Sequence, residues 1–549
     1  MLNSRLKLTQ SDIIFFILLS SDLILKVLLT INHNHWRLGD LLAPLFLADQ
    51  FFHQEIPNLS SQQFLVPMFV GNLMRMLGTP NDFITMLHIS GSVTAVSSSL
   101  TLIPLYIIAR KFLTPIQSTA TVWLTLLLIT NAWFSLHSYF FNLINVYTLF
   151  FTTSIAMMLF CKDKPTVYLV LLSTIVGLSY YVRHEGIVLS LIFVLFLFWS
   201  WKRKDIQKKQ MMYSILVVLS LVILNWIIRI QNPMTNALGF FYSSSAVGGD
   251  ISSFGNFALL NYSFIQLFNL FYTTFGFMLQ GYGASLLAIL TIVGVFFLPI
   301  GYHYLTSQRI HLSWVLIYWL VYTLLILVMA LIQPRAALIG NLSLLQAPTM
   351  ANFDAGSYKG GYIRYFQPLI PFFLLFVYAG VLFSIKRLSE WKKFLVHVCI
   401  VFLMLYQIIQ IGYYYLNNYN RFGKSSIEIA ATDYSSTINY ITTAQFFRNK
   451  NIRQANILYY NSDTANKIFF SFMSGGNTIN CWNGSRFGRP RNEYNCFHKY
   501  PENTFDSLLK AKREKFDYII THTHAPPKYL LRHYSPAFAS GHFRIYKHK

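Results

Sequence analysis

Long apolar runs, separated by short polar segments, occupy the chain from its N-terminus to about residue 415. A helix needs about 20 mostly apolar residues to cross the hydrocarbon core of a bilayer. Residues 266–280 could form an interfacial helix or half of a re-entrant pair, and two further spans there would raise the number of spans to 13. Without them, the pattern predicts eleven transmembrane helices, near residues 12–32, 83–109, 117–135, 139–160, 165–182, 187–201, 211–230, 283–304, 312–332, 366–385 and 394–415.

Basic residues are distributed unevenly between these predicted helices. They concentrate in alternate connecting segments, above all at 110–111, 202–209 and 386–393. Cytoplasmic loops are enriched in Lys and Arg, so we expect these segments and the N-terminus to be cytoplasmic. An odd number of helices then places the C-terminus outside, together with long segments at 33–82, 231–282 and 333–365.

The sequence becomes polar near residue 420, and no spanning segment follows. Strand-like runs at 455–460, 516–521 and 542–546 alternate with an amphipathic run at 504–515, which is typical of a small α/β unit. We therefore expect a transmembrane domain, 1–419, with a first outer loop at 33–82, and a soluble domain, 420–549. The predicted fold is a polytopic α-helical membrane protein with a small C-terminal extracytoplasmic α/β domain.

Composition agrees with this class. Of the 549 residues, 54% are hydrophobic and 11% are charged, against roughly 25% charged in a soluble domain. A soluble multidomain protein is therefore excluded. The formal net charge of +23 follows the loops, so we expect no nucleic-acid partner. Four cysteines are too few for a disulfide framework, and Cys481 and Cys496 could either pair or stay free.

Few acids lie on the predicted outer side, and several of them are in the first outer loop. Asp40 and Asp49 lie there, with Arg37 and His53 near them in the sequence. Asp40 could remove a proton from a hydroxyl or amine acceptor, and the alternative for Asp40 is an acid solvated in a loop. Residues 64–77 of the same loop are apolar but too short to span, so we expect an interfacial helix.

Two further outer clusters could contact a substrate. Arg183 and Glu185 lie where the fifth and sixth predicted helices meet, and they could instead form a structural ion pair. Lys359, Arg364 and Tyr365 precede the tenth helix. Arginine suits bidentate recognition of phosphate, whereas the alternative role is an interfacial anchor.

The order of these motifs resembles a known family. The chain is similar to the C-type (GT-C) integral membrane glycosyltransferases, in particular the dolichyl-phosphate-mannose protein mannosyltransferase and aminoarabinose transferase group. The likeness covers the first six predicted helices and the tenth. It is based on Asp40, Asp49, the segment around Pro67, residues 105–111, Arg183-His184-Glu185-Gly186, and Arg364-Tyr365 with Pro368 and Pro371.

The resemblance implies an enzyme that moves a sugar from a polyprenyl-phosphate donor to a lipid, glycan or protein acceptor at the outer membrane face. Asp40 would be the catalytic base, and Asp49 a second catalytic candidate, because Asn142 and Asn145 stand where many relatives have an acid. Arg364 would bind the donor phosphate. The other implied substrate-binding residues are Arg37, His53, Arg183, Glu185, Lys359 and Tyr365.

The Trp-Trp-Asp signature of oligosaccharyltransferases is absent from the sequence. Its absence argues against an oligosaccharide donor and against the divalent metal of those enzymes, so we expect no cofactor and no metal. The expected location is a bacterial inner (plasma) membrane with a periplasmic active site and C-terminus, or the endoplasmic reticulum with a luminal active site.

Two other function classes compete with a transferase. A transporter or flippase of a lipid-linked sugar would also need many helices and buried charge. The charged motifs lie on one face and not at mid-membrane, which favours the enzyme. A structural membrane protein whose C-terminal domain binds a partner would not explain the convergence of the three charged clusters.

Overall fold

The structure is a computed structural model of the chain. It describes residues 9–32, 42–54, 64–79, 83–123, 125, 143–230, 297–305, 313–318, 320–321, 367–386, 388–392, 457–460, 478–480, 517–522, 533–540 and 543–549, together with individual residues between 394 and 455.

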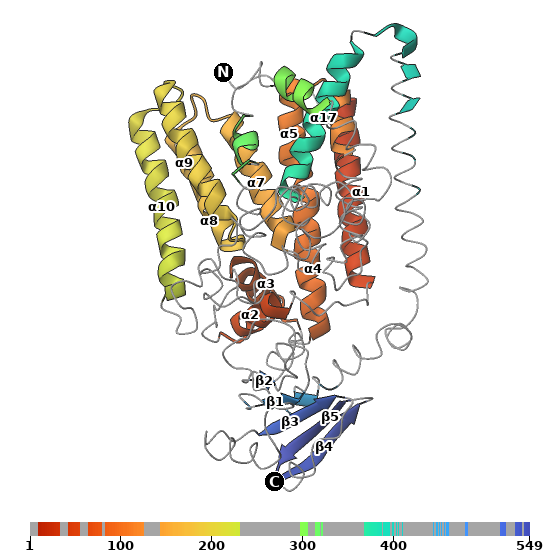
Figure 1. The fold of residues 1–549 in the computed structure, drawn as a ribbon, viewed down its shortest axis with the longest axis vertical. Helices are drawn as coiled ribbons and strands as arrows, with labels where there is room; N and C mark the ends of the chain where they lie inside the picture. Colours follow the sequence, from red (N-terminus) through yellow and green to blue (C-terminus); the bar gives the residue numbers. More distant parts are fainter. Residues whose placement is uncertain are drawn as a thin grey trace, which may run out of the picture.

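Apolar helices running side by side form the greater part of the fold (Figure 1). They agree with the predicted helices in this part of the chain, with small shifts at their ends. The expected helix at 83–109 is divided at Thr101 into α4 and α5. The helices are α1 (Gln10–Asn32), α4 (Phe83–Leu100), α5 (Leu102–Phe112), α7 (Leu143–Leu159), α8 (Thr166–Val182), α9 (Gly186–Lys202), α10 (Lys208–Ile230) and, after the short 3-10 helix η5 (Gln367–Leu369), α17 (Ile370–Ile385).

The expected total of eleven helices stays a prediction. Most of 283–304, 312–332 and 394–415 lies outside the described residues, as do residues 266–280. Within the described part of the chain, Thr85–Phe112 and Lys208–Ile228 are long and apolar enough to cross a membrane by length and composition.

Exposed apolar side chains support a membrane location for these helices. Ile17 on α1 is 59% exposed, and Leu216 on α10 is 61% exposed. These two helices lie at opposite edges of the helical part (Figure 1). Apolar surface of this extent is unfavourable in water and is favourable against acyl chains. We therefore treat the helical part as embedded in a membrane.

A helical hairpin, α2 (Leu42–Phe52) and α3 (Leu65–Met76), lies across one end of the long helices (Figure 1). The expected short helix at 64–77 is confirmed as α3. The preceding helix, α2, was not predicted, because residues 33–63 were interpreted as loop. The hairpin is close-packed, since a Cβ added at Gly71 would overlap the carbonyl oxygen of Ala48 and lie 2.9 Å from Cβ of Phe51.

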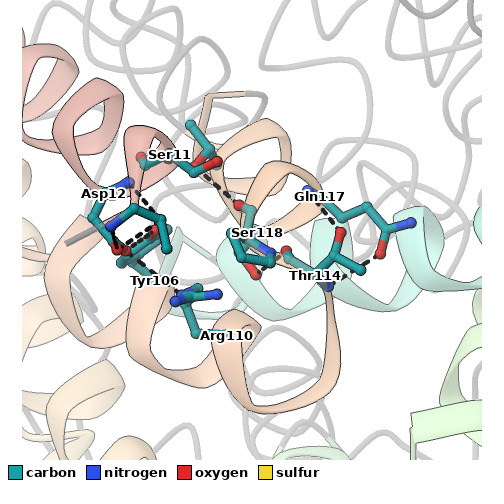
Figure 2. Close-up of polar contacts among 10 residues, drawn as sticks. Ser11, Asp12, Tyr106, Arg110, Thr114, Gln117 and Ser118 are labelled. Atoms are coloured by element: carbon teal, nitrogen blue, oxygen red, sulfur yellow. Dashed lines mark hydrogen bonds and ion pairs between the residues drawn. The ribbon is translucent and has the colours of Figure 1, made fainter. Parts of the chain in front are cut away.

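At the other end of the helical part, polar contacts join α1 to α5. Thr9 caps α1, because its hydroxyl accepts from the Asp12 amide and its own amide donates to Asp12 Oδ2. Asp12 Oδ1 accepts from the Tyr106 hydroxyl at 2.6 Å and lies 3.6 Å from Arg110 Nε. Figure 2 shows this cluster beside the first turn of the helical residues 115–123.

The C-terminal residues form a five-stranded sheet of order β2-β1-β3-β5-β4. β1 pairs in parallel with β2 and β3, whereas β5 is antiparallel to β3 and β4. The predicted strands are confirmed as β1, β3 and β5; β2 and β4 were not predicted, and the expected helix at 504–515 lies outside the described residues. The strands are β1 (Ile457–Tyr460), β2 (Thr478–Asn480), β3 (Tyr518–His522), β4 (Tyr534–Ser540) and β5 (Phe543–His548).

Two hydrophobic clusters stabilise the fold. One lies within the helical part and joins α5, α7, α8, α9 and α17. The other contains Val70 of α3 and Val182 of α8, and it also contains Ile520 and Ile545 of the sheet. The hairpin, the ends of the long helices and the sheet are therefore on the same side of the molecule. The division into domains at residue 420 stays a prediction.

Candidate functional site

The turn between α8 and α9 holds a bidentate ion pair. Arg183 donates from Nη2 to Glu185 Oε1 at 2.7 Å and from Nε to Oε2 at 3.0 Å. Both side chains are mostly buried. Of the two roles expected for these residues, the structural ion pair is present in the structure, and a substrate contact stays a proposal.

Gly186 makes this turn possible. A Cβ at this position would overlap the backbone nitrogen of Tyr180 and lie 2.6 Å from the carbonyl oxygen of Ser179. The start of α9 therefore approaches the end of α8 more closely than any side chain permits. This approach places Glu185 directly beside Arg183.

The ion pair controls the protonation state of the carboxylate. Burial disfavours the charged form of Glu185, but the charge of Arg183 and its hydrogen bonds together outweigh burial and hold the pKa of Glu185 below its usual range. The turn consequently presents an ionised carboxylate with most of its charge balanced by the guanidinium.

Asp49 lies in a different environment from the one expected. It is on α2 and is buried, with 8% of the residue exposed, whereas residues 33–63 were expected to form a loop. His53 follows one turn later, and its Nε2 lies 3.6 Å from Asp49 Oδ1. The helix ends here, because Gln54 adopts a left-handed conformation with φ of 58°.

Packing brings the hairpin and the α8–α9 turn to the same end of the molecule. Leu47 of α2, Phe64 before α3 and Tyr181 of α8 belong to one hydrophobic cluster. The rings of Phe64 and Tyr181 meet edge to face at 5.3 Å between centroids. The hairpin that carries Asp49 and the helix end that precedes Arg183 are therefore packed against each other.

Two tyrosines add to this site and were not predicted. The hydroxyls of Tyr147 and Tyr318 lie 2.7 Å apart, and both side chains are fully buried. Tyr318 is close enough to Arg183 and Glu185 for both charges to act on its hydroxyl. No sequence pattern could reveal this pair, because 171 residues separate its members.

The remaining expected site residues lie outside the described residues: Arg37, Asp40, Lys359, Arg364 and Tyr365. Asn142 is also outside them, whereas Asn145 is buried on α7. Pro368 and Pro371 lie at the start of the helical segment that ends in α17. The roles of the five residues stay predictions.

A further charged pair lies midway along α1. Lys26 Nζ is 2.8 Å from Asp22 Oδ2, and both side chains are almost completely buried. Ser99 of α4 donates to Asp22 at 2.6 Å, and Lys26 donates to Ser98 at 3.1 Å. This buried pair was not among the charged motifs that the sequence analysis singled out.

No group of three or more His, Cys, Asp and Glu residues that could hold a metal ion occurs among the residues that the structure describes.

Comparisons with known proteins give a likeness of fold. No protein-family model matches the chain, and no curated protein matches it. The chain is similar to a structure of the Archaeoglobus fulgidus oligosaccharyltransferase tethered to an acceptor peptide, with a TM-score of 0.50 and 11% identity over 92% of this chain and 69% of that chain.

Two other structures of this enzyme have lower scores. The complex with zinc and sulfate has a TM-score of 0.45 and 11% identity over 91% of this chain and 68% of that chain. The complex of AglB with an inhibitory peptide and a dolichol-phosphate has a TM-score of 0.44 and 10% identity over 92% and 69%. At such identities the likeness concerns architecture alone: this chain is similar in fold to the archaeal oligosaccharyltransferase.

Proposed function

We propose that this protein is a membrane glycosyltransferase that moves a sugar from a polyprenyl-phosphate donor to a lipid, glycan or protein acceptor. The observation that carries the proposal is the buried carboxylate of Asp49, which lies beside His53 at the end of the molecule that also holds the Arg183–Glu185 turn. The likeness in fold to a glycosyltransferase supports it. The narrower assignment to the mannosyltransferase and aminoarabinose transferase group rests on the sequence motifs.

The chemistry requires one base. A polyprenyl phosphate is a leaving group of low basicity, so its bond to the anomeric carbon breaks without an acid. The acceptor oxygen or nitrogen forms the new bond to that carbon, and its proton passes to a carboxylate. We propose that Asp40 is the carboxylate that accepts this proton, and that Asp49 orients Asp40 or the acceptor.

The charged residues around the site suggest which of them bind the sugar, the donor phosphate and the acceptor. Glu185 balances Arg183 through two hydrogen bonds, so this pair suits sugar hydroxyls better than a phosphate. We assign the donor phosphate to Lys359 and Arg364, and we assign a substrate contact to Tyr365, which follows Arg364 in the sequence. Arg37 and His53 complete the proposed acceptor side.

The test is sugar transfer by detergent-purified variants, supplied with polyprenyl-phosphate sugars and candidate acceptors. These substrates are identified by comparing the glycans of cells with and without the protein. General base catalysis is typically worth about 10²–10⁴-fold, so Asp40→Asn should lower turnover by that order while donor binding persists. Asp49→Asn should have a smaller effect.

Matched controls separate chemistry from folding. Asp163→Asn changes an exposed aspartate at the opposite end of the molecule and should leave transfer unchanged.

Arg364→Ala should weaken donor binding, because a charge-assisted hydrogen bond is worth about 1.5–3 kcal/mol. Full activity in both Asp40→Asn and Asp49→Asn would refute the mechanism, and uptake of a lipid-linked sugar without transfer would support a flippase.

The active end is proposed to face the periplasm or the lumen, as the distribution of basic residues predicts. The opposite end would then be cytoplasmic.

A further inference from the structure

Two loops at the end of the helical part opposite the sheet form one continuous structure. They are residues 160–165, between α7 and α8, and residues 202–209, between α9 and α10; we call them together the basic double loop. The Asp163 amide donates to the Asp205 carbonyl at 3.4 Å, and Gln210 Nε2 donates to the Lys164 carbonyl at 3.1 Å. The two loops are therefore fixed relative to each other.

The basic double loop has a large excess of positive charge. Its acids are Asp163 and Asp205, and the carboxylate of Asp205 is mostly buried between Lys162 at 4.0 Å and Arg203 at 3.8 Å. Lys208 and Lys209 begin α10, where the helix dipole disfavours cations unless an anion is near. All the basic side chains are exposed: Lys162, Lys164, Lys202, Arg203, Lys204, Lys208 and Lys209.

Aromatic rings lie one helical turn inward from three of these cations. Arg203 lies over Trp199 at 4.7 Å, Lys209 over Tyr213 at 5.8 Å, and Lys164 over Tyr168 at 5.9 Å. Trp and Tyr with neighbouring Lys and Arg are typical of the headgroup level of a bilayer.

Exposed apolar side chains begin at the level of these rings. Val167 on α8 is 77% exposed, Met212 on α10 is 55% exposed, and Leu216 one turn further is 61% exposed. α10 is a candidate membrane span with 22% of its most apolar window buried. The cations thus lie at the edge of a surface that acyl chains would cover, and a bilayer around α10 would place its lipid phosphates near them.

We propose that the basic double loop binds the headgroups of anionic phospholipids. The recognised chemistry is a phosphate group, and the source is a membrane lipid, because the adjacent exposed apolar surface would hold its acyl chains. Helix α2 and the turn between α8 and α9 lie at the opposite end (Figure 1), so this binding is separate from the proposed sugar transfer.

The test measures lipid binding to the detergent-purified full chain by native mass spectrometry and by the thermal shift on lipid addition. The probes are phosphatidylglycerol, phosphatidylcholine with the same acyl chains, and inorganic phosphate. Each basic residue near an anionic surface contributes about 1 kcal/mol, or about fivefold in affinity. Lys204→Gln/Lys208→Gln/Lys209→Gln should therefore reduce phosphatidylglycerol binding by at least about tenfold.

Two control variants make the result decisive. The first control changes the same three lysines to Arg and should keep phosphatidylglycerol binding. The second control removes exposed charges from the sheet and should not reduce phosphatidylglycerol binding; it is Arg544→Gln/Lys547→Gln/Lys549→Gln. Equal retention of phosphatidylglycerol and phosphatidylcholine would overturn the proposal. So would unchanged binding in the loop variant, or a thermal shift from inorganic phosphate as large as that from the lipid.

Discussion

The Arg183–Glu185 pair gives the sharpest test of how the α8–α9 turn is held. Glu185→Gln keeps the size of the side chain but removes its charge and one of the two acceptor oxygens, which lie 2.7 and 3.0 Å from the guanidinium. The side chains are 17% and 11% exposed, so water replaces little of the lost interaction. Removing one partner of a buried pair costs about 3–5 kcal/mol, and we expect a loss of stability of that order.

A double-mutant cycle separates the pair from its surroundings. Arg183→Gln, Glu185→Gln and the double variant are unfolded by denaturant in detergent, with Glu390→Gln as an exposed carboxylate control. The double variant should lose less than the sum of the single variants, because it leaves no unbalanced charge. Additive losses, or single losses below about 1 kcal/mol, would refute the reasoning.

The same pair predicts a pH dependence. Since the pKa of Glu185 is lowered in the folded state, its contribution is complete above the usual carboxyl value of 4.5 and is lost as the pH falls through the folded-state pKa. The stability difference between wild type and Glu185→Gln should therefore be constant near neutral pH and should shrink below pH 4.5. A difference that grows in acid would contradict the lowered pKa.

Two further predictions concern helix packing. Gly71→Ala should destabilise the α2–α3 hairpin by about 1–3 kcal/mol, because the new methyl group would overlap the Ala48 carbonyl. The control, Met76→Ala, changes a residue that is 82% exposed and should be near neutral. The rate of protease cleavage within the hairpin measures the difference between the two variants. Lys26→Met should lower the free energy of unfolding by about 3–5 kcal/mol, because it leaves the buried Asp22 carboxylate without its cation. Adding Asp22→Leu should restore much of that stability in thermal unfolding. A double variant less stable than Lys26→Met would contradict this.

The sequence by itself determined the positions of the described long helices and of three strands. Length and hydrophobicity are local properties, so α8, α9 and α10 could be placed to within a few residues. β1, β3 and β5 were also found, because runs of β-branched and aromatic residues are visible without knowledge of their partners. The Arg183–Glu185 pair was foreseen as one alternative, since only one residue separates its members.

Tertiary structure alone decided which polar residues are buried and what they contact. Helix α2 has 11 residues, which is too few for a spanning helix, so no local pattern predicted that Asp49 is buried. The Tyr147–Tyr318 contact and the bond from Ser99 to Asp22 join residues 171 and 77 positions apart. A local pattern specifies the apolar face of an element, but the packing of one element against another fixes which polar groups meet, because that choice depends on the whole arrangement of helices.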